Sequence, residues 1–240
     1  MSVTTRIQEL NNRLATNLVS KGVSAEGTET TTELINKVND IESGGTSVIN
    51  PEWTDWRYFS YYDNRNDLVA KLKYSDTANG TNFSNMFNSC KGLTSIPQLD
   101  TSNGTNFSYM FTNCTVLTSI PQIDTSNGAN FSGMFTNCTA LTSIPLLNMS
   151  SIPTTNWDHM FQNCTALENV TFEGTIPVRG NMSVFSSCPN LTVDSLMSFI
   201  NALTNMSSSA TYTITIGSTN LAKLTEEQIQ IATDKRITLQ

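Results

Sequence analysis

Five cysteines recur at regular spacing and are the side chains of this chain best suited to chemistry. They lie 24, 24, 26 and 24 residues apart, at Cys90, Cys114, Cys138, Cys164 and Cys188. Thiols can pair as disulfides, bind a metal or fill a tight apolar interior. An odd count argues against a disulfide framework, and a zinc site would need CxxC pairs or added histidines. We predict buried structural thiols, with disulfides and a metal site as the alternatives.

Groups suited to catalysis are scarce. The single histidine, His159, occupies a repeat position whose residue type varies, so we expect it at the surface and not as a base. The other occupants of this position are Asn85, Tyr109, Gly133 and Ser183. Residues 77–193 contain seven Asp, Glu, Lys and Arg residues, from which no acid pair, nucleophile elbow or phosphate loop can be assembled. We predict no enzymatic activity, no catalytic residues, no metal and no cofactor.

A row of carboxylates also follows the repeat, at Asp76, Asp100 and Asp124. Stacked repeats would place neighbours about 4.8 Å apart, where two charges repel by about 0.9 kcal/mol at water's dielectric. Asx-type turns would offset this repulsion, because each carboxylate would accept from N–H groups of the following "TSNG". Calcium bridging is the functional alternative. We expect the row to break at the fourth repeat, where "NMSSIP" carries two extra residues.

These groups are spaced by an internal repeat in the middle of the chain. The segment "FSYMFTNCTVLTSIPQ" at 107–122 returns as "FSGMFTNCTALTSIPL" at 131–146, and segments 98–121 and 122–145 agree at 20 of 24 positions. A period of 24 lies within the range of leucine-rich repeats. We number the repeats from first to fifth by their cysteines. Three residues before each cysteine stand Phe87, Phe111, Phe135, Phe161 and Phe185, and three after it stand Leu93, Leu117, Leu141, Leu167 and Leu191.

The first half of each repeat is predicted to be a short helix. Phe107, Met110, Phe111 and Cys114 fall at i, i+3, i+4 and i+7, which places them on one helical face. Asn106 precedes this face and could cap it. Stacked repeats cover one another's apolar edges and set equivalent side chains in columns, so a column of small cysteines suits the interior.

The second half is predicted to be a short parallel strand followed by a turn. In "LTSIP" Leu117 and Ile120 face inward, and Pro121 stops or edges the strand because it cannot donate to the ladder. In "DTSNG" Asn127 and Gly128 tolerate positive φ. The exposed positions form a face rich in hydroxyls and amides, which either binds a glycan or is solvated scaffold. This candidate ligand surface comprises Thr94, Ser95, Gln98, Thr118, Ser119, Gln122, Thr142 and Ser143.

Composition argues against several classes of function. The 240 residues carry a formal net charge of −7, whereas a duplex-binding protein needs clustered Lys and Arg to replace counterions. No apolar run approaches the roughly 20 residues that span a bilayer. The opening "MSVTTRIQELNNRL" lacks the apolar core of a secretory signal. We expect no nucleic-acid partner, no membrane span and no export by that route.

The N-terminal part divides into three segments. Residues 1–44 are predicted to form a helical hairpin, residues 45–52 a flexible linker, and residues 53–75 an aromatic cap on the first repeat. The apolar stripe of the hairpin either packs helix on helix or forms a docking and oligomerisation module. Its candidate residues are Ile7, Leu10, Leu14, Leu34 and Val38.

The aromatic segment "WTDWRYFSYY" at 53–62 has a second interpretation. Aromatic faces stack on pyranose rings, so Trp53, Trp56 and Tyr58 could form a sugar platform instead of a cap.

The repeats are predicted to span 76–193, and 194–240 is predicted to form two larger βα units that close the far end. A helix starts at Asp194 and carries Leu196, Phe199, Ile200 and Leu203. A strand follows at "TYTITI", then a helix opened by a Thr225 to Gln228 capping box, and "ITLQ" could be a final strand.

The phrase "MFxNCxxLTSIP…DTSN" resembles the BspA-type bacterial leucine-rich repeats, which occur in surface proteins and in phages of Gram-positive hosts. The resemblance covers residues 76–193. The closing segment from "LTVDSLMSFI" onward, and the opening "LATNLVSKGVSAEGTETTTELINKVNDI", are similar to parts of phage structural proteins. The resemblance implies a virion component, either an adhesin-like fibre or a decoration protein of tail or head. It carries no catalytic or ligand-binding residues onto this chain.

We therefore predict an α/β leucine-rich-repeat solenoid of 24-residue coils, each a short helix plus a short parallel strand, preceded by a helical hairpin. The predicted function is a non-enzymatic structural protein on the exterior of a phage virion, whose repeat surface attaches to the host. Expected partners are other virion proteins through residues 1–44, further copies of this chain, and a host surface glycan. The alternatives are a purely structural capsid or tail decoration protein and a bacterial cell-surface adhesin.

Overall fold

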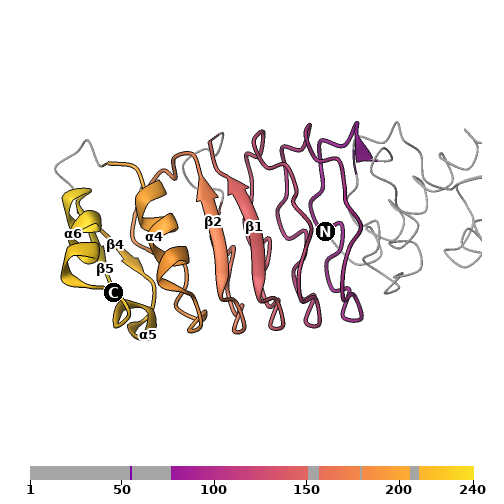
Figure 1. Ribbon diagram of the computed structural model, residues 1–240. Coiled ribbons are helices and arrows are strands. Elements are labelled where there is room, and N and C mark those ends of the chain that lie inside the picture. The colour runs from indigo at the N-terminus through magenta and orange to yellow at the C-terminus, as the bar shows by residue number, and fades with distance from the viewer. Residues whose placement is uncertain (1–54, 56–76, 151–156, 179, 206–210) are drawn as a thin grey trace, which may run out of the picture. The chain divides into compact units, whose positions relative to one another are not determined.

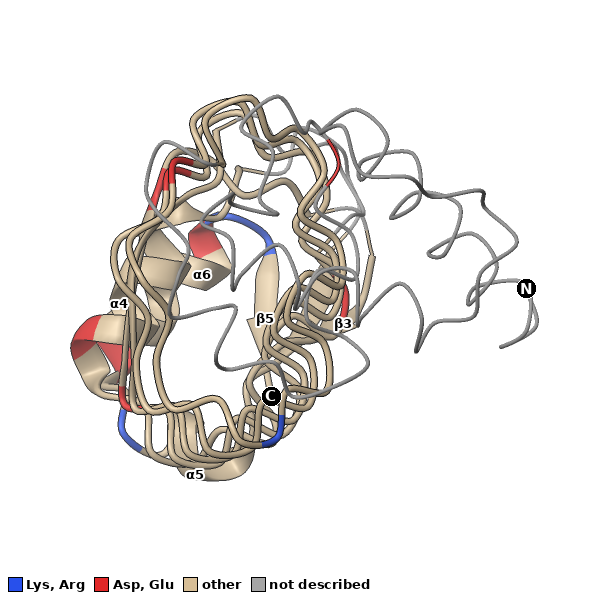
Figure 2. Cartoon of the chain, turned by 90° about the vertical axis from the view of Figure 1, so that its right-hand side faces the viewer, with Lys and Arg blue, Asp and Glu red and all other residues tan. Residues whose placement is uncertain are grey.

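Neighbouring repeats stand side by side and are joined by backbone hydrogen bonds (Figure 1). The computed structural model describes residues 55, 77–150, 157–178, 180–205 and 211–240, all within one compact unit, Glu52–Gln240. Viewed along the row, the backbones of successive repeats follow nearly the same outline (Figure 2). The fold is mixed α/β with parallel pairing, which is compatible with the predicted leucine-rich-repeat architecture.

Several predicted segments lie outside the described residues. These are the hairpin over 1–44, the linker over 45–52 and, apart from Asp55, the aromatic cap over 53–75. The individual residues concerned are Ile7, Leu10, Leu14, Leu34, Val38, Trp53, Trp56, Tyr58 and Asp76. What was predicted for them stays a prediction.

In the first half of each repeat, backbone N–H groups donate alternately to the next repeat and within their own. Four N–H groups of the second repeat reach carbonyls of the third at 2.8–2.9 Å, in the pairs Phe107–Asn130, Tyr109–Ser132, Phe111–Met134 and Asn113–Thr136. Those of Met110, Thr112 and Cys114 reach the carbonyl three residues back, at 3.0–3.2 Å. The Ser108 N–H reaches Asn106 Oδ1 at 3.1 Å. Every backbone donor of this segment is therefore satisfied without a helix.

The helix predicted for this segment is wrong, because two residues per repeat adopt the left-handed backbone conformation. In the second repeat Tyr109 has φ 57° and Asn113 has φ 62°, and the same positions are left-handed in the first, third and fourth repeats. A left-handed residue at every fourth position prevents continuous i→i−4 bonding, so the segment is a series of turns. These turns still return the predicted apolar side chains to the interior, since Met110 and Phe111 are fully buried.

The second half of each repeat follows the predicted strand, but proline does not end it. β1, Ser143–Asn148, pairs in parallel with β2, Asn169–Glu173. Pro145 lies inside β1 at a shift in register, where two residues of β1 oppose one of β2. Its missing N–H thus falls in a bulge. The inward side chains are as predicted, since Leu117 is 0% and Ile120 is 6% exposed.

The C-terminal part contains a second parallel sheet, in the order β3–β4–β5, with three helices. Its elements are β3 Met182–Ser183, α4 Val193–Ala202, β4 Tyr212–Thr215, α5 Ser218–Leu221, α6 Glu226–Asp234 and β5 Ile237–Leu239. The strands in "TYTITI" and "ITLQ" and the Thr225–Gln228 capping box are confirmed. The start of α4 differs, because the N-cap is Thr192 and Asp194 lies in the first turn. No helix in the described part is long and apolar enough to cross a bilayer.

Two columns of stacked phenylalanine rings fill the interior of the repeats. Ring centroids in neighbouring repeats lie 5.1–6.0 Å apart in one column and 5.5–5.6 Å in the other. The first column is Phe87, Phe111, Phe135, Phe161 and Phe185, and the second is Phe83, Phe107 and Phe131. Each ring is at most 1% exposed, and burying one contributes about 1.5–3 kcal/mol. Because each ring stacks on its equivalent, the columns also favour one register between repeats.

The five cysteines stand in single file in this core, all free and all buried as predicted. From the second repeat onward, each sulfur donates to the carbonyl of the phenylalanine in the preceding repeat, at 3.0–3.1 Å. The pairs are Cys114–Phe87, Cys138–Phe111, Cys164–Phe135 and Cys188–Phe161. Cysteine therefore fills a small apolar site and also supplies a hydrogen-bond donor between repeats.

A ladder of asparagine amides joins the repeats at the second left-handed position. Asn163 donates to Asn137 and Asn137 donates to Asn113, each at 2.8 Å between Nδ2 and Oδ1. Asn113 in turn donates to Ser89 Oγ at 3.4 Å. The residue type that tolerates positive φ thus also links one repeat to the next.

Replacing Gly128 by alanine tests the phenylalanine packing. A Cβ there would lie 2.1 Å from Phe131 Cζ, whereas a Cβ at Gly180 would meet no heavy atom within 4 Å. We expect Gly128→Ala to lower the free energy of unfolding by about 1–3 kcal/mol, because the buried ring must move. Gly180→Ala should leave it unchanged or raise it by less than about 1 kcal/mol. Guanidinium denaturation measures both, and equal changes would contradict the packing described.

The buried thiols predict a pH dependence of stability. Burial raises the pKa of Cys138 from its ordinary 9.0 to about 12 and raises that of Cys114 further. Between those pH values the unfolded chain loses thiol protons that the folded chain keeps, so the free energy of unfolding must fall as pH rises. The slope reaches at most about 1.4 kcal/mol per pH unit for each such thiol.

Thiol titration with Ellman's reagent, alongside alkaline denaturation, checks this expectation. The folded protein should be unreactive at mildly alkaline pH, and all five thiols should react after unfolding in guanidinium. Rapid reaction of the folded protein would show that the sulfurs are accessible and would refute the expectation.

Candidate functional site

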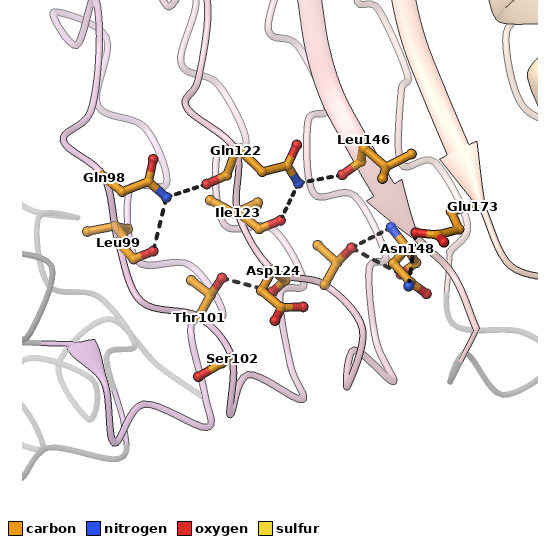
Figure 3. Close-up of a pocket in the computed structure, with 11 residues that line it drawn as sticks. Gln98, Leu99, Thr101, Ser102, Gln122, Ile123, Asp124, Leu146, Asn148 and Glu173 are labelled. Atoms are coloured by element: carbon orange, nitrogen blue, oxygen red, sulfur yellow. Dashed lines mark hydrogen bonds between the residues drawn. The ribbon is translucent and has the colours of Figure 1, made fainter.

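A groove of about 540 Å³ crosses the first four repeats at the end of their strand segments (Figure 3). The volume is within the range of small-molecule and peptide sites. It is lined by Gln98, Leu99, Thr101, Ser102, Gln122, Ile123, Asp124, Thr125, Leu146, Asn148 and Glu173. Leu99, Ile123 and both threonines are buried, whereas both glutamines, Leu146 and the two carboxylates are exposed.

Two glutamines bridge neighbouring repeats along the groove. Gln122 Nε2 donates to the carbonyls of Leu146, in the next repeat, and Ile123, each at 2.8 Å. Gln98 Nε2 donates in the same way to the carbonyl of Gln122. In Figure 3 both side-chain oxygens point away from these bonds. The amide donors thus hold repeats together, and the amide oxygens are left at the surface.

The carboxylate row forms Asx turns, as predicted. Asp100 Oδ1 accepts from the N–H of Ser102 at 3.1 Å and Asp124 Oδ1 from that of Ser126 at 2.9 Å. The row does not break at the fourth repeat, contrary to the prediction, because Asn148 takes the next place and makes the same turn. Pairing of β1 with β2 sets Asn148 opposite Glu173, which therefore continues the row.

Hydroxyl columns fix the turns beside this row. Thr101 Oγ1 donates to the carbonyl of Asp124 at 2.8 Å, and Thr125 Oγ1 donates to that of Asn148 at 3.0 Å. Both threonines are 1% exposed. Because each bond runs from one repeat to the next, the carboxylates are held at fixed intervals along the groove.

The structure brings only part of the predicted ligand surface into the groove. Gln98 and Gln122 line it. The other six residues do not line it, although all are exposed except half-buried Ser143. They are Thr94, Ser95, Thr118, Ser119, Thr142 and Ser143. Thr142 joins its column to the preceding repeat, because its N–H and hydroxyl both donate to the Thr118 carbonyl.

Comparison with known families places most of these repeats in described sequence classes. Residues 131–231 match the BspA type leucine rich repeat region. The chain contains a BspA-type leucine-rich-repeat region. Residues 57–173 match a family described as Mycoplasma protein of unknown function, DUF285. No curated protein and no solved structure matches the chain.

Titratable residues of the leucine-rich-repeat region are not gathered into a reactive centre in the described part. His159 is exposed, as predicted, and its backbone is left-handed with φ 57°. Among the described residues, no three His, Cys, Asp or Glu side chains are placed to share a metal ion. Whether calcium binds the carboxylate row stays an untested alternative.

Charge in the leucine-rich-repeat region has one sign over a long stretch. Residues 92–178 contain five Asp and Glu and no Lys or Arg. The cations Lys223 and Lys235 lie in the C-terminal part, where their ammonium groups donate to backbone carbonyls at 2.6–2.7 Å. Burial lowers the pKa of Lys235. The groove therefore lies in an uncompensated negative field.

Sequence reasoning did not identify the groove itself. It found the two glutamines and two of the aspartates but treated them as separate features. Counting 24 residues onward from Asp124 reaches Asn148, which was the available signal that the row continues. Glu173 could not be found this way, because the fourth repeat is two residues longer.

Gln122→Ala tests the amide bridge between repeats. The variant loses two hydrogen bonds to backbone carbonyls at an exposed site. We expect the free energy of unfolding to fall by about 1 kcal/mol. Ser119→Ala is the matched control, since its exposed hydroxyl makes no hydrogen bond with described residues, and should change stability by less than about 0.5 kcal/mol. Urea denaturation compares the two, and a silent Gln122→Ala would show that the bridge adds nothing.

Proposed function

We propose that this chain is a non-enzymatic attachment protein whose leucine-rich-repeat region forms a continuous solenoid and presents its side surface to a ligand. The observation that carries the proposal is the fixed register of the repeats. Exposed Thr, Ser and Gln side chains stand in columns on a backbone joined by hydrogen bonds at every repeat. Such a surface binds through many equivalent, pre-positioned groups, so little conformational freedom is lost on binding.

The resemblance to phage members of the BspA type supports the finer proposal of a location on the exterior of a virion. In this proposal residues 1–44 dock onto other virion proteins or join copies of the chain. The exposed columns around Thr94, Thr118 and Thr142 then face the host envelope.

A bacterial cell-surface adhesin is the second candidate. The match of residues 57–173 to a family described from Mycoplasma supports this alternative. A purely structural decoration protein is the third candidate, and it would carry the same repeats without a ligand.

Two measurements on the full-length chain separate these candidates. Fluorescently labelled protein should bind saturably, at micromolar concentration, to Gram-positive cells or their purified wall polysaccharide. Antibody against the chain should label the exterior of phage particles by immunogold microscopy. Gold on bacterial cells instead would favour the adhesin. Labelled particles without cell binding would favour the decoration protein, and folded protein that shows neither result would overturn the proposal.

A further inference from the structure

The hydrogen-bond donors of the groove are already used within the protein. Both glutamine amides donate to backbone carbonyls. The Thr101 and Thr125 hydroxyls donate to carbonyls of the next repeat, and the Ser102 hydroxyl donates to Asp100 Oδ1 at 2.7 Å. Asn148 Nδ2 donates to Glu173 Oε2 at 3.3 Å. A ligand in the groove therefore meets side chains whose donors are engaged.

The acceptors of the groove are not used up in the same way. Asp124 receives one hydrogen bond on Oδ1 and Glu173 one on Oε2 from described residues, so each exposed carboxylate retains an oxygen for another donor. The oxygens of both glutamine side chains also face outward (Figure 3). No Lys or Arg in 92–178 neutralises these groups. A suitable ligand must therefore bring donors and positive charge.

The apolar part of the lining adds a second requirement. Leu146 is 38% exposed, and Leu99 and Ile123 line the groove beside it. An ammonium or guanidinium group on a long aliphatic stem satisfies both requirements, because the stem covers apolar surface while the charged end reaches a carboxylate. Neutral sugars suit the site less well, since they usually exchange hydrogen bonds in both directions with protein donors and acceptors.

We propose that the groove binds an extended, cationic peptide segment of a partner protein, with Lys or Arg side chains at Asp124 and Glu173. The proposal rests on the attachment function above and names its ligand class. Asp124 and Glu173 stand two repeats apart in one row, which corresponds to about 10 Å. In a polyproline II peptide, residues i and i+3 project from the same side about 9.3 Å apart. A pair of cationic residues three apart would therefore match the two carboxylates.

The test uses the full-length chain and a fluorescein-labelled peptide carrying two lysines three residues apart in a proline-rich sequence. Fluorescence anisotropy should show saturable binding that weakens with added salt. Asp124→Asn and Glu173→Gln should each raise Kd about fivefold, and the double variant about 25-fold. These variants keep the oxygens that accept from Ser126 and Asn148, and asparagine already makes this turn at Asn148.

Asp158→Asn is the matched control, because it removes one exposed carboxylate of the same region that does not line the groove. Its Kd should equal that of the parent chain, and a peptide with glutamine in place of lysine should not bind. Equal weakening by Asp158→Asn would overturn the proposal, as would equal binding of the glutamine peptide. A neutral oligosaccharide that displaces the lysine peptide, with an affinity that the double variant leaves unchanged, would also overturn it.

The outcome separates this proposal from the function on which it rests. If the double variant still attaches to cells like the parent chain, the peptide groove is wrong and the attachment function stands. If the parent chain binds neither cells nor peptide, both fail.

Discussion

Each repeat satisfies its backbone N–H groups partly within itself and partly on its neighbour, and this division governs the rest of the structure. The alternation at Phe107–Cys114 requires a backbone that turns every few residues while staying parallel to the next repeat. A regular helix would direct all its N–H groups inward along its own axis and leave none for the neighbour. Left-handed residues at two fixed positions provide the required reversal, and the stacked phenylalanines, cysteines and asparagines then fall into columns.

Periodicity in the sequence identified the correct core but the wrong conformation in the first half of each repeat. Phe107, Met110 and Phe111 have helical spacing, yet a series of turns with similar length buries the same side chains. The informative signal was the residue type between them. Asn113, Asn137 and Asn163 occupy a left-handed position, and Gly133 occupies the other, where residues with low cost at positive φ are favoured.

Other parts of the fold were predictable because their signals are local. The capping box at Thr225 and the alternating strand around Ile214 depend on neighbours within a few residues. Pro145 was harder, since its place inside β1 depends on a bulge created by the partner strand. The groove was harder still, because its donors are engaged across repeats, and no single repeat shows that the amide of Gln122 is already bonded to Leu146.

The near identity of the second and third repeats has a consequence for heredity. Their coding segments can misalign during recombination, and the product gains or loses one unit of 24 residues in phase. Because the interior contacts of Phe111 and Cys138 reach only the adjacent unit, such a product keeps every kind of contact that the parent had. The number of binding positions along the protein can thus drift between lineages faster than its architecture, which lets a population sample reach and avidity without first losing the ability to fold.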